Sequence, residues 1–125
     1  MRPLGRSGFS AMGRQLVEHR LCLERDVAAG IVPVAGFAAV DGVFGELSTL
    51  LEAARVELEA AGPAALEPGF VVPFVGGCGA LDRQMFSAMY GELDPVRLGQ
   101  LAAELRAEGR ALLESLRARV RRVAA

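Results

Sequence analysis

The chain has 125 residues, of which 52% are hydrophobic and 23% are charged, and its net charge is −1. These totals fit one folded domain and argue against an intrinsically disordered chain, which would combine low hydrophobicity with a high net charge. They also argue against a nucleic-acid partner, because binding to phosphates usually requires a clear basic excess.

Cysteine and histidine are scarce, with only Cys22, Cys78 and His19 in the chain. Two cysteines are too few for a disulfide scaffold or a structural zinc site, and no Glu-x-x-His pairing is present to build a carboxylate-bridged metal site. Lysine is absent, which excludes a Walker-type phosphate loop and Schiff-base chemistry. We therefore expect no metal and no cofactor, and we expect reduced thiols in a cytoplasmic protein.

Residues 1–9 are basic but are not followed by an apolar run with a cleavage pattern, so they do not match a signal peptide. We expect them to form a flexible arm ahead of a single helical domain over residues 10–125. Ser10 suits the N-cap of a first helix over 11–29, and Gly30 suits its end.

The region 33–61 has the most regular pattern in the chain. From Phe37 to Ala61 its apolar residues recur three or four positions apart, the spacing that keeps one face of an α-helix against a partner. Pro33 fits the first helical position, and Gly62 followed by a proline fits the end. The pattern predicts one long helix over 33–61.

Glycines interrupt this predicted helix at Gly36, Gly42 and Gly45. Each costs up to ~1 kcal/mol relative to alanine, so we expect a second backbone to approach closely and offset the cost. In an alternative interpretation, the helix starts at Asp41 and residues 31–40 are extended.

Residues 62–69 contain two prolines and two glycines and are expected to form one long loop. Residues 70–75 have the composition of a strand, although Pro73 could not donate to a central ladder. With Pro73 at the first helical position, the apolar residues that follow resume the helical spacing. The preferred prediction is a helix over 73–92, and the alternative is a short strand over 70–75.

Asp94 followed by Pro95 is the clearest helix start in the chain, and it predicts a last helix over 95–122. Four arginines crowd the end of this helix, where the helix dipole favours positive charge. They could bind a phosphate or an acidic partner, but a solvated helix end is the preferred interpretation. The four are Arg117, Arg119, Arg121 and Arg122.

Together the patterns predict a mainly α fold, an antiparallel four-helix bundle. The alternative is an α+β fold with two short strands near 31–40 and 70–75. The second and fourth helices are longer than the others, so apolar residues at their ends should protrude and form a protein interface. The predicted interface residues are Phe37, Phe44, Leu51, Leu58, Leu112 and Leu116.

Cys78 has two interpretations that depend on where the third helix begins. If the helix begins near Ala80, the thiol lies at a helix N-terminus among glycines, where it would be reactive. If the helix begins at Pro73, the thiol is a small core residue, which is the preferred interpretation. The glycine-rich run around it also fails as a dinucleotide fingerprint, because Asp82 replaces the third glycine.

No catalytic signature is present, so the preferred hypothesis is a non-catalytic interaction or assembly protein that self-associates or serves as an adaptor for a larger partner. One alternative is a small enzyme or ligand-binding domain that uses Cys78, the single weak catalytic candidate. Another is membrane association through the uncharged runs 27–40 and 69–81. Each run is shorter than the ~20 residues of a spanning helix, which makes the membrane alternative the less favoured one.

Overall fold

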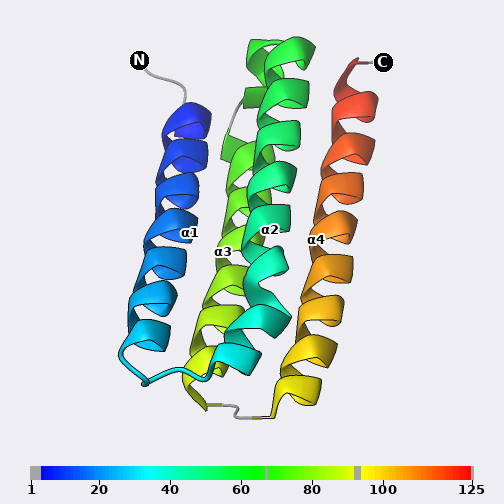
Figure 1. Ribbon diagram of the computed structural model, residues 1–125. Coiled ribbons are helices and arrows are strands. Elements are labelled where there is room, and N and C mark those ends of the chain that lie inside the picture. The colour runs from blue at the N-terminus through cyan, green and yellow to red at the C-terminus, as the bar shows by residue number, and fades with distance from the viewer. Residues whose placement is uncertain (1–3, 67, 92–93, 125) are drawn as a thin grey trace.

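Helices make up almost all of the chain that the computed structural model describes, which is residues 4–66, 68–91 and 94–124 (Figure 1). The α-helices are α1 (Leu4–Ala28), α2 (Val34–Ala61), α3 (Pro68–Gly91) and α4 (Pro95–Ala124), and a 3₁₀ helix, η1 (Pro63–Leu66), follows α2. The prediction of a mainly α four-helix bundle is confirmed. The α+β alternative is wrong, since 31–40 and 70–75 form no strand within the described residues.

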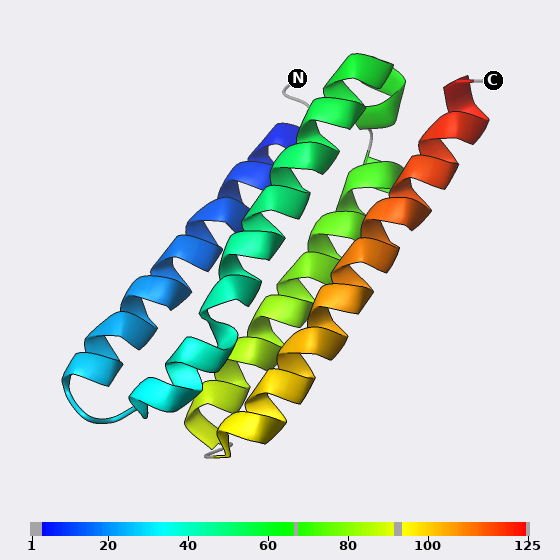
Figure 2. The ribbon, with the colours of Figure 1, turned by 45° about the vertical axis from the view of Figure 1, so that its right-hand side comes forward.

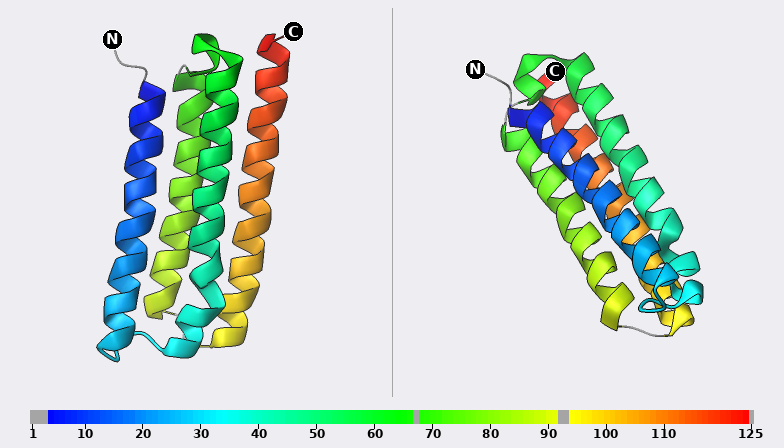
Figure 3. Two further views of the ribbon diagram at one scale, coloured as in Figure 1. Left: turned by 45° about the horizontal axis from the view of Figure 1, so that its top comes forward. Right: turned by 60° about the vertical axis from the view of Figure 1, so that its left-hand side comes forward.

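Successive helices run in opposite directions along the bundle (Figure 2). Both α1 and α4 pack against α2 and α3, while α2 and α3 also touch each other. As a result α1 and α4 lie on opposite sides of the molecule (Figure 3). This arrangement places α1 beside α3 and α2 beside α4, and the two helices of each of these pairs run parallel.

Local backbone chemistry fixes the helix ends that the sequence marks. Gly30 ends α1 with a positive φ of 78°, and the amide of Ile31 donates to the carbonyl of Asp26 at 2.8 Å. This is the Schellman arrangement, which satisfies the last carbonyls of a helix. Gly62 ends α2 with a φ of 104°. At the start of α4, the side chain of Asp94 accepts a hydrogen bond from the amide of Val96 at 3.0 Å.

The first helix begins earlier than the sequence suggests. It starts at Leu4, so Ser10 lies inside α1 rather than at its N-cap, and residues 4–9 of the predicted arm are helical. Residues 1–3 lie outside the described part of the chain. The reason is apolar packing: Phe9 is buried, and its ring lies 6.2 Å from that of Phe74 on α3. The apolar face of α1 therefore continues beyond Ser10.

The third helix also begins earlier, at Pro68, so Pro73 lies inside α3 and the predicted loop over 62–69 is largely replaced by η1 and the start of α3. Pro73 has no amide hydrogen to donate to the carbonyl of Gly69, four residues before it. Arg119 on α4 donates to that carbonyl instead, with Nη1 3.4 Å from the oxygen. A long-range contact thus compensates for the proline.

The second helix runs unbroken from Val34 to Ala61, directly after Pro33, so the alternative start at Asp41 is wrong. Its glycines are explained only in part. A Cβ atom at Gly36 would lie 3.1 Å from Leu98, and one at Gly42 would overlap Arg106, so side chains of α4 cover both. Gly45 has no neighbour within 4 Å of such an atom, so close packing does not explain that glycine.

Candidate functional site: the polar seam between α1 and α3

A row of polar and aromatic side chains, here called the polar seam, lies where α1 packs beside α3. Its members on α1 are spaced four, three and four residues apart, and those on α3 four residues apart, so each set occupies one face of its helix. Contacts between the two sets occur at both ends of the row. The polar seam consists of Gln15, His19, Cys22 and Asp26 on α1 and Asp82, Phe86 and Tyr90 on α3.

Asp82 is fully buried, and it is the one charged side chain buried to this extent within the described residues. Its Oδ2 atom accepts a hydrogen bond from Nε2 of Gln15 at 2.8 Å and lies 2.7 Å from Nδ1 of His19. Its Oδ1 atom has no hydrogen-bond partner within the described part of the chain. Burial raises the pKa of Asp82, while Gln15, His19 and Arg83 oppose that rise.

The imidazole of His19 is held between this carboxylate and an aromatic ring. Its ring lies 4.1 Å from that of Phe86 at an interplanar angle of 16°, which is a stacked arrangement. Phe86 in turn meets Tyr90 edge to face, with 5.3 Å between the ring centroids. The only histidine in the chain is therefore a structural contact of α1 with α3.

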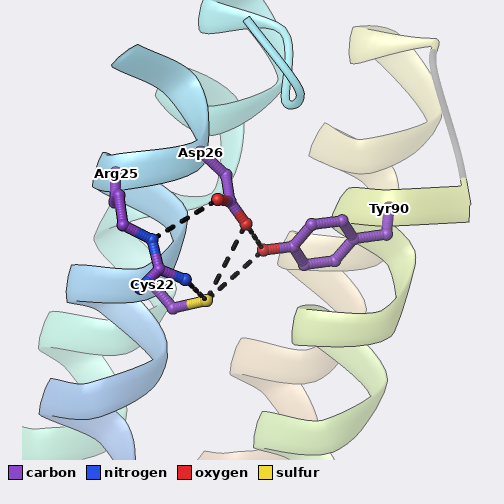
Figure 4. A network of polar contacts seen from close by, with 4 residues as sticks. All are labelled: Cys22, Arg25, Asp26 and Tyr90. Atoms are coloured by element: carbon purple, nitrogen blue, oxygen red, sulfur yellow. Dashed lines mark hydrogen bonds and ion pairs between the residues drawn. The ribbon is translucent and has the colours of Figure 1, made fainter. Parts of the chain in front are cut away.

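The second end of the polar seam is a network around Asp26 (Figure 4). The hydroxyl of Tyr90 donates to Oδ2 of Asp26, and Sγ of Cys22 lies 3.8 Å from the same oxygen and 3.6 Å from the tyrosine oxygen. Arg25 approaches from the solvent side, with Nη2 3.4 Å from Sγ of Cys22. Desolvation and the neighbouring Asp26 raise the pKa of Tyr90.

The polar seam joins the two helices, because Gln15 and His19 of α1 contact Asp82, and Tyr90 of α3 donates to Asp26. In the described part of the chain no group of three or more His, Cys, Asp and Glu side chains is arranged to hold a metal ion.

Sequence reasoning missed this site, although one signal was present. Asp82 lies four residues after Cys78 and three before Met85, two core residues of α3, so it occupies a core position of the helix. A charged residue at such a position requires partners, and Gln15 and His19 on α1 supply them. Only the packing of α1 beside α3 identifies them.

Most of the predicted interface residues lie inside the bundle. Phe44, Leu51, Leu58 and Leu116 are buried, and Phe37 and Leu112 are partly buried. The expected apolar overhang of the long helices is therefore not exposed at these positions. A charge at Leu58 or Leu116 would disrupt the core and would test folding rather than association.

Leu112 borders a surface groove of about 400 Å³ between α3 and α4. The helices can approach closely here because Gly77 has no side chain. A Cβ atom at this position would lie 2.8 Å from both Cδ atoms of Leu112, which is too close for a packed contact. The groove mixes small, apolar and polar side chains. Its lining consists of Gly77, Ala80, Leu81, Gln84, Glu108, Ala111, Leu112 and Ser115.

The four arginines of α4 do not form one cluster. Arg117 binds Glu57 on α2, with Nε 2.9 Å from Oε1, and Glu114 at 2.8 Å. Arg119 donates to the carbonyl of Gly69, as described above. Arg121 and Arg122 are exposed in the last turn, so they are the members of the predicted anion site that face solvent.

Cys78, the weak catalytic candidate, is fully buried within α3. Because α3 begins at Pro68, the thiol is well inside the helix and not at its N-terminus. Burial raises the pKa of this thiol to about 12. The geometry matches the interpretation of Cys78 as a core residue.

By length and composition, α2 is the one described helix that could cross a membrane. The core helix of a bundle meets the same criterion, so this finding is weak support for a membrane location. Comparison with known proteins adds no assignment, because no family model, no curated protein and no solved structure matches the chain.

Proposed function

We propose that the protein is a non-catalytic, cytoplasmic assembly protein that self-associates through one apolar end of its bundle. The observation that carries the proposal is a group of strongly exposed aliphatic side chains, here called the terminal patch. It consists of Ile31, Val34 and Val96, which are 64%, 69% and 67% exposed.

The terminal patch comes from segments that are distant in the sequence but adjacent in the fold. Ile31 lies in the α1–α2 connection, Val34 begins α2 and Val96 lies in the first turn of α4, all at the same end of the bundle (Figure 1). The first turns of α2 and α4 are in contact, since Leu98 lies against Gly36. The three side chains therefore lie at one end of the bundle.

Self-association is favoured because burying each aliphatic side chain of this size contributes about 1.5–3 kcal/mol. Single exposed apolar residues are ordinary, but a group of them at one end usually marks a contact. The edge of the patch carries an acid and a base, Asp94 and Arg97, so two copies related by a two-fold axis can meet without placing like charges together.

The test is the mass of the full chain in reducing buffer, measured by size-exclusion chromatography with light scattering. We expect a dimer or larger closed assembly for the natural sequence and a monomer for the double variant Val34→Asp and Val96→Asp. The matched control is Val17→Asp with Leu21→Asp, two residues on the outer face of α1 that are 56% and 58% exposed.

The control variant should keep the mass of the natural protein, and circular dichroism should show unchanged helix content in all three. A monomer for the natural protein would overturn self-association. An assembly that survives in the Val34 and Val96 variant would show that a different surface is used, with the groove between α3 and α4 as the next one to change.

A further inference from the structure

We propose that the contact between His19 and Asp82 is a proton-operated latch that sets how firmly α1 is held on the bundle. The proposal concerns the opening of one helix within the chain, so it does not depend on self-association. Its basis is the placement of the only fully buried charged side chain of the described residues at the α1–α3 joint.

The carboxylate of Asp82 is incompletely compensated while α1 is in place. Both of its contacts, with Gln15 and His19, use Oδ2, and Oδ1 has no hydrogen-bond partner among the described residues. An ionised carboxylate in such a site carries a large desolvation cost. When α1 moves away, water reaches the carboxylate and this cost disappears.

The polar side chains that contact Asp82 from another helix lie on α1. Gln15 and His19 approach it across the joint, and Arg83 acts on it from α3 itself. On α2, Asp41 pairs with Arg20, and Glu46 pairs with Arg106 and Arg110 of α4. On α4, Glu108 lines the surface groove between α3 and α4. The charge of Asp82 is therefore coupled to the position of α1.

The direction of the effect follows from proton linkage. Burial raises the pKa of Asp82 above its ordinary value of 3.8, so the closed state binds more protons than the open state between the ordinary and the raised value. The stabilisation is complete below 3.8 and is lost as the pH rises through the raised pKa. The latch therefore loosens as the pH rises.

Native-state hydrogen exchange followed by mass spectrometry tests the latch on the full chain. We expect the protection of α1 amides relative to α4 amides, corrected for intrinsic exchange, to be highest at pH 4 and to fall as the pH rises to 8, because Asp82 ionises above its ordinary pKa of 3.8 in the closed state. In Asp82→Asn, which keeps an acceptor for Gln15, this ratio should change by less than about twofold over the same range.

The matched control is Asp41→Asn, which removes a different ion pair between α1 and α2, with Arg20 at 3.0 Å. It should lower the protection of α1 at every pH and keep the pH dependence. His19→Gln is a second test if Asp82→Asn does not fold, because it removes a group that lowers the pKa of Asp82, so the fall in the protection of α1 should move to higher pH. An α1/α4 ratio that is independent of pH in the natural protein, or a dependence that persists in Asp82→Asn, would overturn the proposal.

Discussion

The two cysteines occupy opposite environments, and this difference can be measured residue by residue. Cys22 is only partly buried and touches Arg25 at the surface, while Cys78 is enclosed in the core. Burial raises the pKa of Cys78 from the ordinary 9.0 to about 12. At pH 8 the thiolate fraction of Cys78 is therefore about 1,000-fold lower than that of a cysteine with the ordinary pKa. With Ellman's reagent at pH 8 and without denaturant, one thiol per chain should react rapidly and the second only as the protein opens.

Single substitutions assign the two phases. Cys22→Ser should remove the rapid phase, and Cys78→Ser should leave it unchanged. Rapid reaction of Cys78 in the folded Cys22→Ser variant would revive the alternative of a reactive thiol.

At the scale of the elements, the sequence allowed the helices to be predicted but not all of their starts. The ends at Gly30 and Gly62 and the start at Asp94 depend on local chemistry, so they could be identified directly. The start of α3 could not, because Pro73 leaves the carbonyl of Gly69 without an amide donor, and the Arg119 that donates to it lies fifty residues later in the chain. The composition of residues 70–75 is typical of a strand, and only Pro73 and the spacing of the apolar residues after it favoured a helix.

Alanine substitutions at two glycines on neighbouring helices distinguish the effect of helix propensity on stability from the effect of packing. Gly45→Ala on α2 should stabilise the protein by about 1 kcal/mol, because the new methyl group meets nothing within 4 Å and alanine favours the helix. Gly109→Ala on α4 should give a free energy of unfolding at least about 1 kcal/mol lower than that of Gly45→Ala, because its Cβ atom would lie 2.9 Å from Leu50 and 3.6 Å from Leu47. Urea unfolding followed by circular dichroism measures both, and equal effects would show that the α2–α4 contact is looser than the structure indicates.

For the whole molecule, the parallel pairing of α1 with α3 decides where the polar groups meet. Alternating helix directions were predictable from short connections, but which helix lies beside which was not. The same helices in a different order around the bundle would leave Asp82 without His19. The polar seam therefore depends on the order of the helices around the bundle. The terminal patch depends on this order as well, because its residues come from the starts of α2 and α4, which must lie side by side.

The packing order also bears on the membrane hypothesis. In the bundle, α2 turns Val40, Phe44 and Leu47 inward, while Glu46 binds Arg106 and Arg110 of α4. To cross a bilayer, α2 would have to leave these partners and bury charged side chains, each costing about 2.5–3.5 kcal/mol at the centre of the membrane.

We therefore expect the folded chain to stay at the bottom of a density gradient when mixed with phosphatidylcholine vesicles. Leu116→Asp places a charge in the core and should open the bundle, freeing the apolar face of α2 to bind the vesicles. Flotation of the natural protein with its helix content and thermal transition intact would contradict the expectation, because a closed bundle would then be binding lipid through its exterior. Flotation of the variant alone would show that burial within the bundle, and not a lack of apolar length, keeps α2 out of the membrane.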